Sequence, residues 1–178
     1  MKVFGFAGWS GSGKTTLIEQ LIPRLAMRAG KVSLVKHAHH AFDIDHPGKD
    51  SYRHREAGAS EVLVSSARRY AITHELRGDA ELTLQEAIDR LSACDLVLVE
   101  GFKRERIPKL EVWRPAVGKP LLHPVDDAIV GIATDTPDAL PGTRLPIFGL
   151  QDIDEIATFV VDRAADGLFP IDDTSRRE

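Results

Sequence analysis

The sequence predicts an α/β fold, in which a mostly parallel β-sheet is flanked by helices and carries a β-hairpin insertion. Three short apolar runs, at 3–7, 32–35 and 96–99, are continuous rather than alternating. Such runs are typical of central parallel strands that are buried on both faces. A glycine-rich loop and a helical pattern join the first two runs. Because parallel strands need a crossover connection, this order predicts a βαβ unit.

The first half of the chain continues with one helix and one irregular segment. Leu17, Leu21, Leu25 and Met27 recur at near-helical spacing, and Gly30 suits the end of that helix. From 38 to 60 the pattern is lost, because this segment is polar and contains a Pro-Gly turn signal. A polar segment of this length in a compact domain is more often functional than idle.

The second half of the chain returns to regular elements. Two short strands, 61–66 and 69–76, predict the hairpin, and Thr83 opens a helix over 83–93 with Glu86 at capping-box spacing. Strands follow at 109–114, 128–135 and 146–150, and a last helix at 153–164. We expect residues 1–168 to form a single domain and 169–178 to be a disordered tail.

Composition excludes several classes of protein. The 178 residues include 23 Lys and Arg against 27 Asp and Glu, a net charge of −4 that argues against a dedicated nucleic-acid binder. Cys94 is the only cysteine, so there is no disulfide framework and no cysteine metal site. The sequence shows neither a signal peptide nor an apolar run of about 18 residues. We therefore expect a cytoplasmic protein that binds neither nucleic acid nor membrane.

The segment GWSGSGKT matches the phosphate-loop pattern G-x-x-x-x-G-K-[ST], between an apolar strand and an amphipathic helix. Glycines let backbone N–H groups gather around phosphate oxygens, and the helix N-terminus adds its positive dipole. Lys14 is expected to reach the β- and γ-phosphates, and the Thr15 hydroxyl to bind Mg²⁺. The nucleotide-binding residues predicted here are Gly8, Ser10, Gly11, Ser12, Gly13, Lys14, Thr15 and Thr16.

A second carboxylate for the metal is predicted at the end of a neighbouring strand. DLVLVEG begins with Asp95 and ends with Glu100. Ligands of open α/β sheets gather at the carboxyl ends of the strands. That rule favours Glu100, with Asp95 as a cap or surface residue. By the same rule Lys36 neutralises phosphate charge. We predict Lys14 and Glu100 as the catalytic residues.

The segment 36–51 is rich in His and Asp, and three interpretations are open. A zinc site would use such side chains, although the spacing fits no standard signature. A loop that contacts the γ-phosphate, Mg²⁺ or a partner's substrate is the simpler role. In that case Asp50 or Asp45 would hold the metal through water. The third interpretation is a polar surface loop without chemistry.

Taken in order, GWSGSGKTTL, VKHAHHAFDIDHPGKDSYRHREAGA, VEGFK, PKLEVWR and ATD resemble the MobB family, the molybdopterin-guanine dinucleotide biosynthesis adapter proteins of the P-loop NTPase superfamily. The resemblance covers roughly residues 1–165 and is most specific in the His/Asp block. It implies a small homodimeric GTP-binding protein that assists in attaching GMP to molybdopterin, while a partner guanylyltransferase, MobA, carries out the transfer. A more distant likeness to dethiobiotin synthetase implies that Lys36, Asp50 and Glu100 serve phosphate and metal.

Two features of ordinary GTPases are absent. The sequence has no N-K-x-D guanine signature, and no catalytic Gln or Arg finger is identifiable. Because no catalytic Gln or Arg finger is identifiable, we predict weak intrinsic GTPase activity at most. Because the guanine signature is absent, we expect the base to be recognised by Thr134 and Asp135, at the end of the strand 128–135.

The sequence therefore predicts an adapter protein with GTP and Mg²⁺ as cofactors, a MobA-like partner, and molybdopterin as a further ligand. Two alternatives from other classes stay open. One is a P-loop small-molecule kinase, in which 38–60 would bind the phosphoryl acceptor. The other is a nucleotide-dependent metal chaperone that uses His37, His39 and His40.

Overall fold

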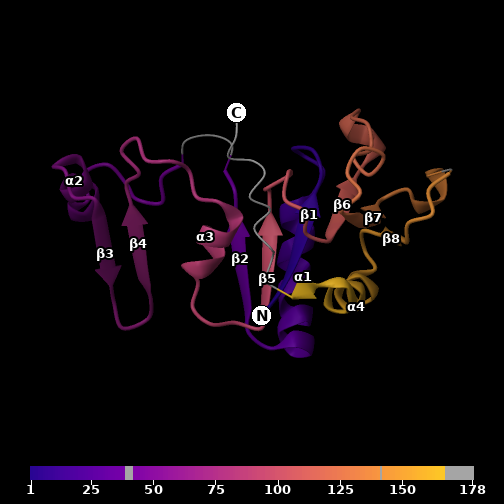
Figure 1. Ribbon diagram of the computed structural model, residues 1–178, viewed down its shortest axis with the longest axis horizontal. Helices are drawn as coiled ribbons and strands as arrows, with labels where there is room; N and C mark the ends of the chain where they lie inside the picture. The colour runs from indigo at the N-terminus through magenta and orange to yellow at the C-terminus, as the bar shows by residue number, and fades with distance from the viewer. Residues whose placement is uncertain (39–41, 141, 167–178) are drawn as a thin grey trace. The chain divides into compact units, whose positions relative to one another are not determined.

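The computed structural model describes residues 1–38, 42–140 and 142–166, which fall into two compact units (Figure 1). The first unit is Met1–His37 with the chain from Glu86 onward, and the second is Ala38–Gln85. The elements in chain order are β1 (Lys2–Ala7), α1 (Lys14–Ala29), β2 (Val32–Lys36), α2 (Asp50–Glu56), β3 (Glu61–Ser65), β4 (Tyr70–His74), α3 (Leu84–Asp89), β5 (Leu96–Glu100), β6 (Lys109–Trp113), the 3₁₀ turn η1 (Pro115–Val117), β7 (Ile129–Thr134), the 3₁₀ turn η2 (Pro137–Ala139), β8 (Ile147–Gly149), α4 (Ile153–Arg163) and β9 (Ala165–Asp166).

The first unit is built on a seven-stranded sheet in the order β2-β5-β1-β6-β7-β8, and the short β9 pairs with β1. Every pair is parallel except β1 with β9. The predicted mostly parallel sheet is therefore confirmed. One detail was wrong: β2 is an edge strand with half-buried or exposed side chains. The reason is that β5 lies between β1 and β2, so only β1 and β5 are enclosed as expected.

The strands do not all end at the same level. Glu100 of β5 is in register with Phe6 of β1 and with Lys36 of β2. On the other side of β1, however, Ala7 is opposite Glu111, so β6 runs on for two residues beyond the end of β1. β7 reaches the same level as β6 because Thr134 is opposite Trp113.

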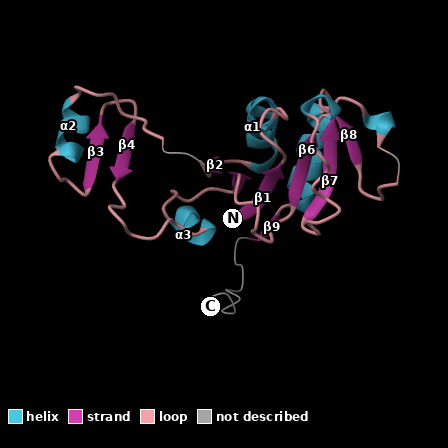
Figure 2. Ribbon diagram, turned by 90° about the horizontal axis from the view of Figure 1, so that it is seen from above, coloured by secondary structure: helices cyan, strands magenta, loops and turns pink. Residues whose placement is uncertain are grey.

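The main core lies between this sheet and the helices α1 and α4, which pack against each other (Figure 1). The neighbouring strands β6, β7 and β8 are seen side by side in Figure 2. Leu17, Leu21 and Leu25 of α1 are buried as predicted, but Met27 is 76% exposed. Met27 follows Leu25 by only two residues and therefore points to another side of the helix. Gly30 ends the helix with a φ of +96°. No helix in the described part of the chain is long and apolar enough to cross a membrane.

The second unit contains the predicted hairpin and a helix that the sequence did not reveal. β3 and β4 pair antiparallel, with Leu63 opposite Ile72. The unexpected helix is α2, seven residues inside the polar segment 38–60. The helix predicted over 83–93 is shorter than expected, since α3 ends at Asp89. The strands at 109–114, 128–135 and 146–150 and the last helix are confirmed as β6, β7, β8 and α4. The tail 169–178 lies outside the described residues.

Candidate functional site

The phosphate loop connects β1 to α1 and is shaped by its glycines. Gly8 has a φ of +142°, and a Cβ placed on it would lie only 2.4 Å from the Val112 carbonyl oxygen and 2.8 Å from Ser12 Oγ. Ser12 is buried, and its hydroxyl has no hydrogen-bond partner in the described part of the chain. Gly13, with a φ of +95°, is the N-cap of α1. The loop thus presents backbone N–H groups and a helix N-terminus to one point, an arrangement that suits an anion.

Lys14 lies across this loop. Its Nζ donates to the carbonyl oxygens of Gly8 and Trp9, each at 2.9 Å. Burial lowers the pKa of Lys14 below its ordinary 10.5; the Glu100 carboxylate raises it, while the charges of Lys103 and Lys36 lower it further. The Lys14 ammonium is therefore one of several positive charges at this edge, and Glu100 is the carboxylate that compensates it.

Glu100 links the loop to the neighbouring strands. Thr15 Oγ1 donates to Glu100 Oε1 at 3.2 Å, and Lys36 Nζ lies 3.3 Å from Glu100 Oε2. The Glu100 side chain is only 10% exposed. The register explains this meeting, because β5 and β2 end level with each other and β1 ends one residue further. The structure brings together Lys14, Thr15, Lys36 and Glu100, and a hydroxyl beside a carboxylate is a ligand pair that Mg²⁺ accepts.

The other residues predicted in the phosphate site are accessible to solvent. Ser10, Gly11 and Thr16 are exposed and lie on the loop or in the first turn of α1. Asp95, at the opposite end of β5, accepts a hydrogen bond from the Lys31 backbone N–H at 2.7 Å. This contact fits the expected capping role of Asp95.

At the end of β7, only one of the two predicted base-reading residues is accessible. Thr134 is fully buried, and its hydroxyl accepts a hydrogen bond from the Thr136 backbone N–H at 3.2 Å. Its side chain therefore supports the turn after β7. Asp135 is 43% exposed, and its Oδ2 lies 3.6 Å from Nε of Arg114. Asp135 is the group at this strand end that is available to a ligand.

Asp50, the predicted loop ligand of the metal, belongs to the second unit. It is the first residue of α2, its side chain is 87% exposed, and it lies 3.7 Å from Arg53. Asp43 and Asp45 are engaged differently, since both pair with the buried guanidinium of Arg55. Of the three aspartates, Asp50 therefore has the most exposed side chain. Its role at the metal stays a prediction.

The His-based metal hypothesis finds no support among the described residues. In the described ranges, no three His, Cys, Asp or Glu side chains gather as metal ligands would. His39 and His40 lie outside the described residues. His37 follows β2, and its ring lies 4.9 Å from that of Phe102.

Sequence reasoning missed two residues at this edge of the sheet. Arg114 follows β6 directly and pairs with Asp135. Trp9, in the phosphate loop, donates from its indole to the Pro120 carbonyl oxygen at 2.8 Å and lies under the ammonium groups of Lys103 and Lys119. The strand-end rule that selected Glu100 would also have selected Arg114.

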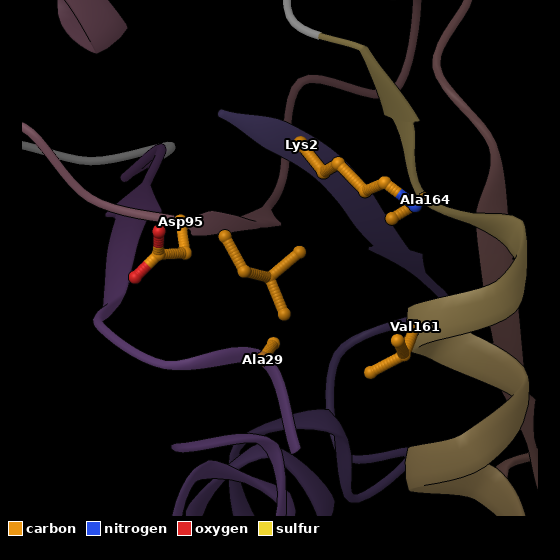
Figure 3. A pocket seen from close by; sticks show the side chains of 6 residues that line it. Lys2, Ala29, Asp95, Val161 and Ala164 are labelled. Carbon is orange, nitrogen blue, oxygen red and sulfur yellow. The ribbon is translucent and has the colours of Figure 1, made fainter. Parts of the chain in front are cut away.

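A cavity of about 250 Å³ lies elsewhere in the first unit, at the opposite edge of the sheet (Figure 3). Its lining combines apolar side chains with Lys2 and Asp95 at the amino ends of β1 and β5. Asp95 is already bonded to the backbone there. This cavity is separate from the phosphate loop, and we interpret it as a packing gap between α1, α4 and the sheet.

Comparisons with known proteins agree on one family. The family model described as molybdopterin guanine dinucleotide synthesis protein B matches residues 3–135. The chain is 42% identical to the molybdopterin-guanine dinucleotide biosynthesis adapter protein of Escherichia coli, over 90% of this chain and 91% of that protein. It is 43% identical to the protein of the same name from Haemophilus influenzae, over 89% and 86%.

Solved structures show the same fold. The crystal structure of Bacillus subtilis MobB matches with a TM-score of 0.72 at 22% identity, over 94% of this chain and 100% of that one. A MobB homologue from Bacillus stearothermophilus matches with a TM-score of 0.61 at 25% identity, over 91% and 97%.

Proposed function

Because the chain belongs to the molybdopterin guanine dinucleotide synthesis protein B family, we propose that it is an adapter in the biosynthesis of that dinucleotide and binds GTP with Mg²⁺. The observation that carries this proposal is the meeting of Thr15, Lys36 and Glu100 beside the phosphate loop. A glycine loop alone would bind any anion. A hydroxyl and a buried carboxylate at the same point add the ligands that a metal-bound triphosphate needs.

The adapter role implies a partner enzyme, since a protein that assists a transfer leaves the transfer to another. We propose that the partner is a MobA-like guanylyltransferase and that molybdopterin is its second substrate. The site in the first unit offers Lys14 and Lys36 as charges on the phosphates. None of the described residues near the loop has the role of a water-positioning Gln. We therefore expect hydrolysis by the protein alone to be slower than about 10⁻² s⁻¹, as in unassisted GTPases.

A capture experiment tests this proposal. The purified protein, with and without Mg²⁺ and GTP, is used to retain a purified guanylyltransferase of the same pathway, and GTP affinity is measured by calorimetry. We expect nucleotide to change the amount retained. The Lys14→Ala variant should lose that dependence and bind GTP at least tenfold more weakly, because a desolvated charge-assisted contact is lost.

Lys31→Ala, an exposed lysine after α1, serves as the matched control and should behave like the wild-type protein. Unchanged GTP affinity in Lys14→Ala would refute the phosphate-loop assignment. If GTP binds but no guanylyltransferase is retained in any nucleotide state, the adapter role is refuted instead.

A further inference from the structure

Arg114 reaches the phosphate loop from the adjacent strand. It follows β6, which runs two residues beyond β1, so Arg114 lies beside the loop rather than below it. Three atoms of its guanidinium group lie 3.5–3.7 Å from the position that a Cβ on Gly13 would occupy. Glycine in a phosphate loop lets the ligand approach the backbone closely. The group that packs on Gly13 is therefore next to the phosphate path.

The positive charges beside Gly13 favour the binding of an anion. Gly13 caps the N-terminus of α1, where the helix dipole is positive, so a second positive charge there is unfavourable unless an anion compensates both. The carboxylate that the first unit provides is Asp135, but Nε of Arg114 lies 3.6 Å from its Oδ2, too far for a good hydrogen bond. Nε of Arg114 is buried and has no hydrogen-bond partner among the described residues.

The pairing with Asp135 is also loose. The two side chains are 40% and 43% exposed, and exposed ion pairs of this kind contribute little to stability. A phosphate group offers a stronger partner, because the planar guanidinium can donate two parallel hydrogen bonds to its oxygens. Exchange of Asp135 for phosphate would satisfy Arg114 better and would release the Asp135 carboxylate.

We propose that Arg114 is a phosphate ligand of the bound nucleotide, supplied by the same chain, and that Asp135 holds it in place until the phosphates arrive. The inference rests on the proposed binding of a nucleoside triphosphate at the loop. It adds a residue that contacts the polyphosphate and couples phosphate binding to the base: Asp135 becomes available to the base only when Arg114 has turned to the phosphates.

Inorganic tripolyphosphate is a suitable probe, because it has no base. Calorimetry at constant ionic strength should show that Arg114→Gln weakens tripolyphosphate binding by roughly ten- to a hundredfold, as expected for a hydrogen-bonded charge. Asp135→Asn should tighten binding several-fold, because Arg114 loses its competing partner. In the double variant Arg114→Gln/Asp135→Asn, the second substitution should have no effect. This last result is the signature of the exchange, since a merely structural pair would weaken binding in both single variants.

Arg106 and Asp127 form a matched control pair in the same unit, exposed and 3.9 Å apart. Arg106→Gln and Asp127→Asn should leave tripolyphosphate binding unchanged. If Arg114→Gln does not fold, as judged by its thermal transition, Arg114→Lys replaces it and should show a smaller loss in the same direction. Unchanged binding in the Arg114 variants, or a weakened Asp135→Asn, overturns the inference. Failure of the wild-type protein to bind tripolyphosphate overturns the triphosphate site as well, so the two failures are distinguishable.

Discussion

At the scale of single residues, Asp135 is the group that we expect to select the base. Guanine presents N1–H and its N2 amino group side by side, and one carboxylate accepts both, whereas adenine has no hydrogen on N1. Asn would lose an acceptor and gain a donor, which suits the C2 carbonyl of xanthine. Asp135→Asn should therefore weaken GTP binding, improve XTP binding and leave the Mg²⁺ dependence intact. Competition binding with GTP, ATP and XTP measures the order of preference.

The control for this prediction is Asp138→Asn, an exposed aspartate three residues further along. It should keep the wild-type preference. If Asp135→Asn also keeps that preference, the base is read elsewhere.

Glu100 is the residue through which the metal should act. Glu100→Gln keeps the shape of the side chain but removes the charge that faces Thr15 and Lys36. We expect the Mg²⁺ concentration needed for half-maximal GTP binding to rise roughly tenfold, and the residual hydrolysis rate to fall. Titration of GTP affinity against Mg²⁺ measures the first effect and phosphate release the second. Glu19→Gln, on the exposed side of α1, is the control; equal Mg²⁺ dependence in the two variants would contradict the role of Glu100.

The site residues could be predicted from the sequence where a motif or the end of an apolar strand marks them. Lys14 and Thr15 were predicted from the phosphate-loop pattern. Lys36 and Glu100 were predicted because each ends an apolar run, and parallel strands bring such positions together. Arg114 satisfies the same rule, but its proximity to Gly13 depends on the offset between β1 and β6, which no local pattern encodes. Thr134 was predicted at the base and is buried, because its hydroxyl completes the turn to Thr136.

At the scale of elements, the apolar strands and long helices were predictable and α2 was not. The strands were found from continuous apolar runs, and α1 and α4 from helical periodicity. Arg55 is the one buried residue of α2, Ser51 and Tyr52 are partly buried, and the other residues are exposed, so the segment shows no apolar helical stripe. What holds it is tertiary: Arg55 donates to both carboxylate oxygens of Asp43 and pairs with Glu75 beside β4. Charged side chains that find each other only after folding leave no periodic signal.

The Asp43–Arg55 pair predicts a pH dependence of the second unit. Hydrogen bonding to Arg55 holds the pKa of Asp43 below its ordinary value of 3.8. A carboxyl group whose pKa is lowered by folding contributes stability above its unfolded pKa and loses it as the pH falls through the lowered value. We expect the melting temperature to fall more steeply below about pH 4 in the wild-type protein than in Asp43→Asn.

Asp43→Asn should already melt a few degrees lower at neutral pH, because the charge-assisted bond is missing there. Thermal scans by circular dichroism between neutral pH and about pH 2 make the comparison. Asp79→Asn, an exposed aspartate of the same unit, should follow the wild-type curve. Parallel curves for wild type and Asp43→Asn would contradict the prediction.

At the scale of the whole molecule, we expect a homodimer that forms through the hairpin. Leu63, Val64, Tyr70 and Ile72 of β3 and β4 are between 52% and 63% exposed. A two-stranded ribbon with this much exposed apolar surface and open edges is a site for pairing with another chain. Light scattering at micromolar concentration should report a dimer, and Leu63→Lys combined with Ile72→Glu should report a monomer.

The two substitutions are chosen because Leu63 and Ile72 are directly opposite each other in the hairpin. Lysine and glutamate placed opposite each other attract within one hairpin, so the hairpin itself is preserved. Val125→Lys, an 86% exposed apolar residue of the first unit, is the control and should stay dimeric. A wild-type protein that scatters as a monomer would refute the proposal.

Because β6 extends beyond β1, the strands of the first unit's sheet end at two levels along its carboxyl edge. The strands β6, β7 and β8 end at the upper level, two residues or roughly 7 Å beyond the end of β1. The strands β5 and β2 end one residue below β1 and form the lower level with it. In our proposal, a nucleotide on the phosphate loop lies beside this offset, with its phosphates near Arg114 and its base near Asp135. Its terminal phosphate would then lie at the lower level, near Lys36 and Glu100 at the ends of β2 and β5. The phosphate end and the base end of the nucleotide would therefore meet strands that end at different levels of the same sheet.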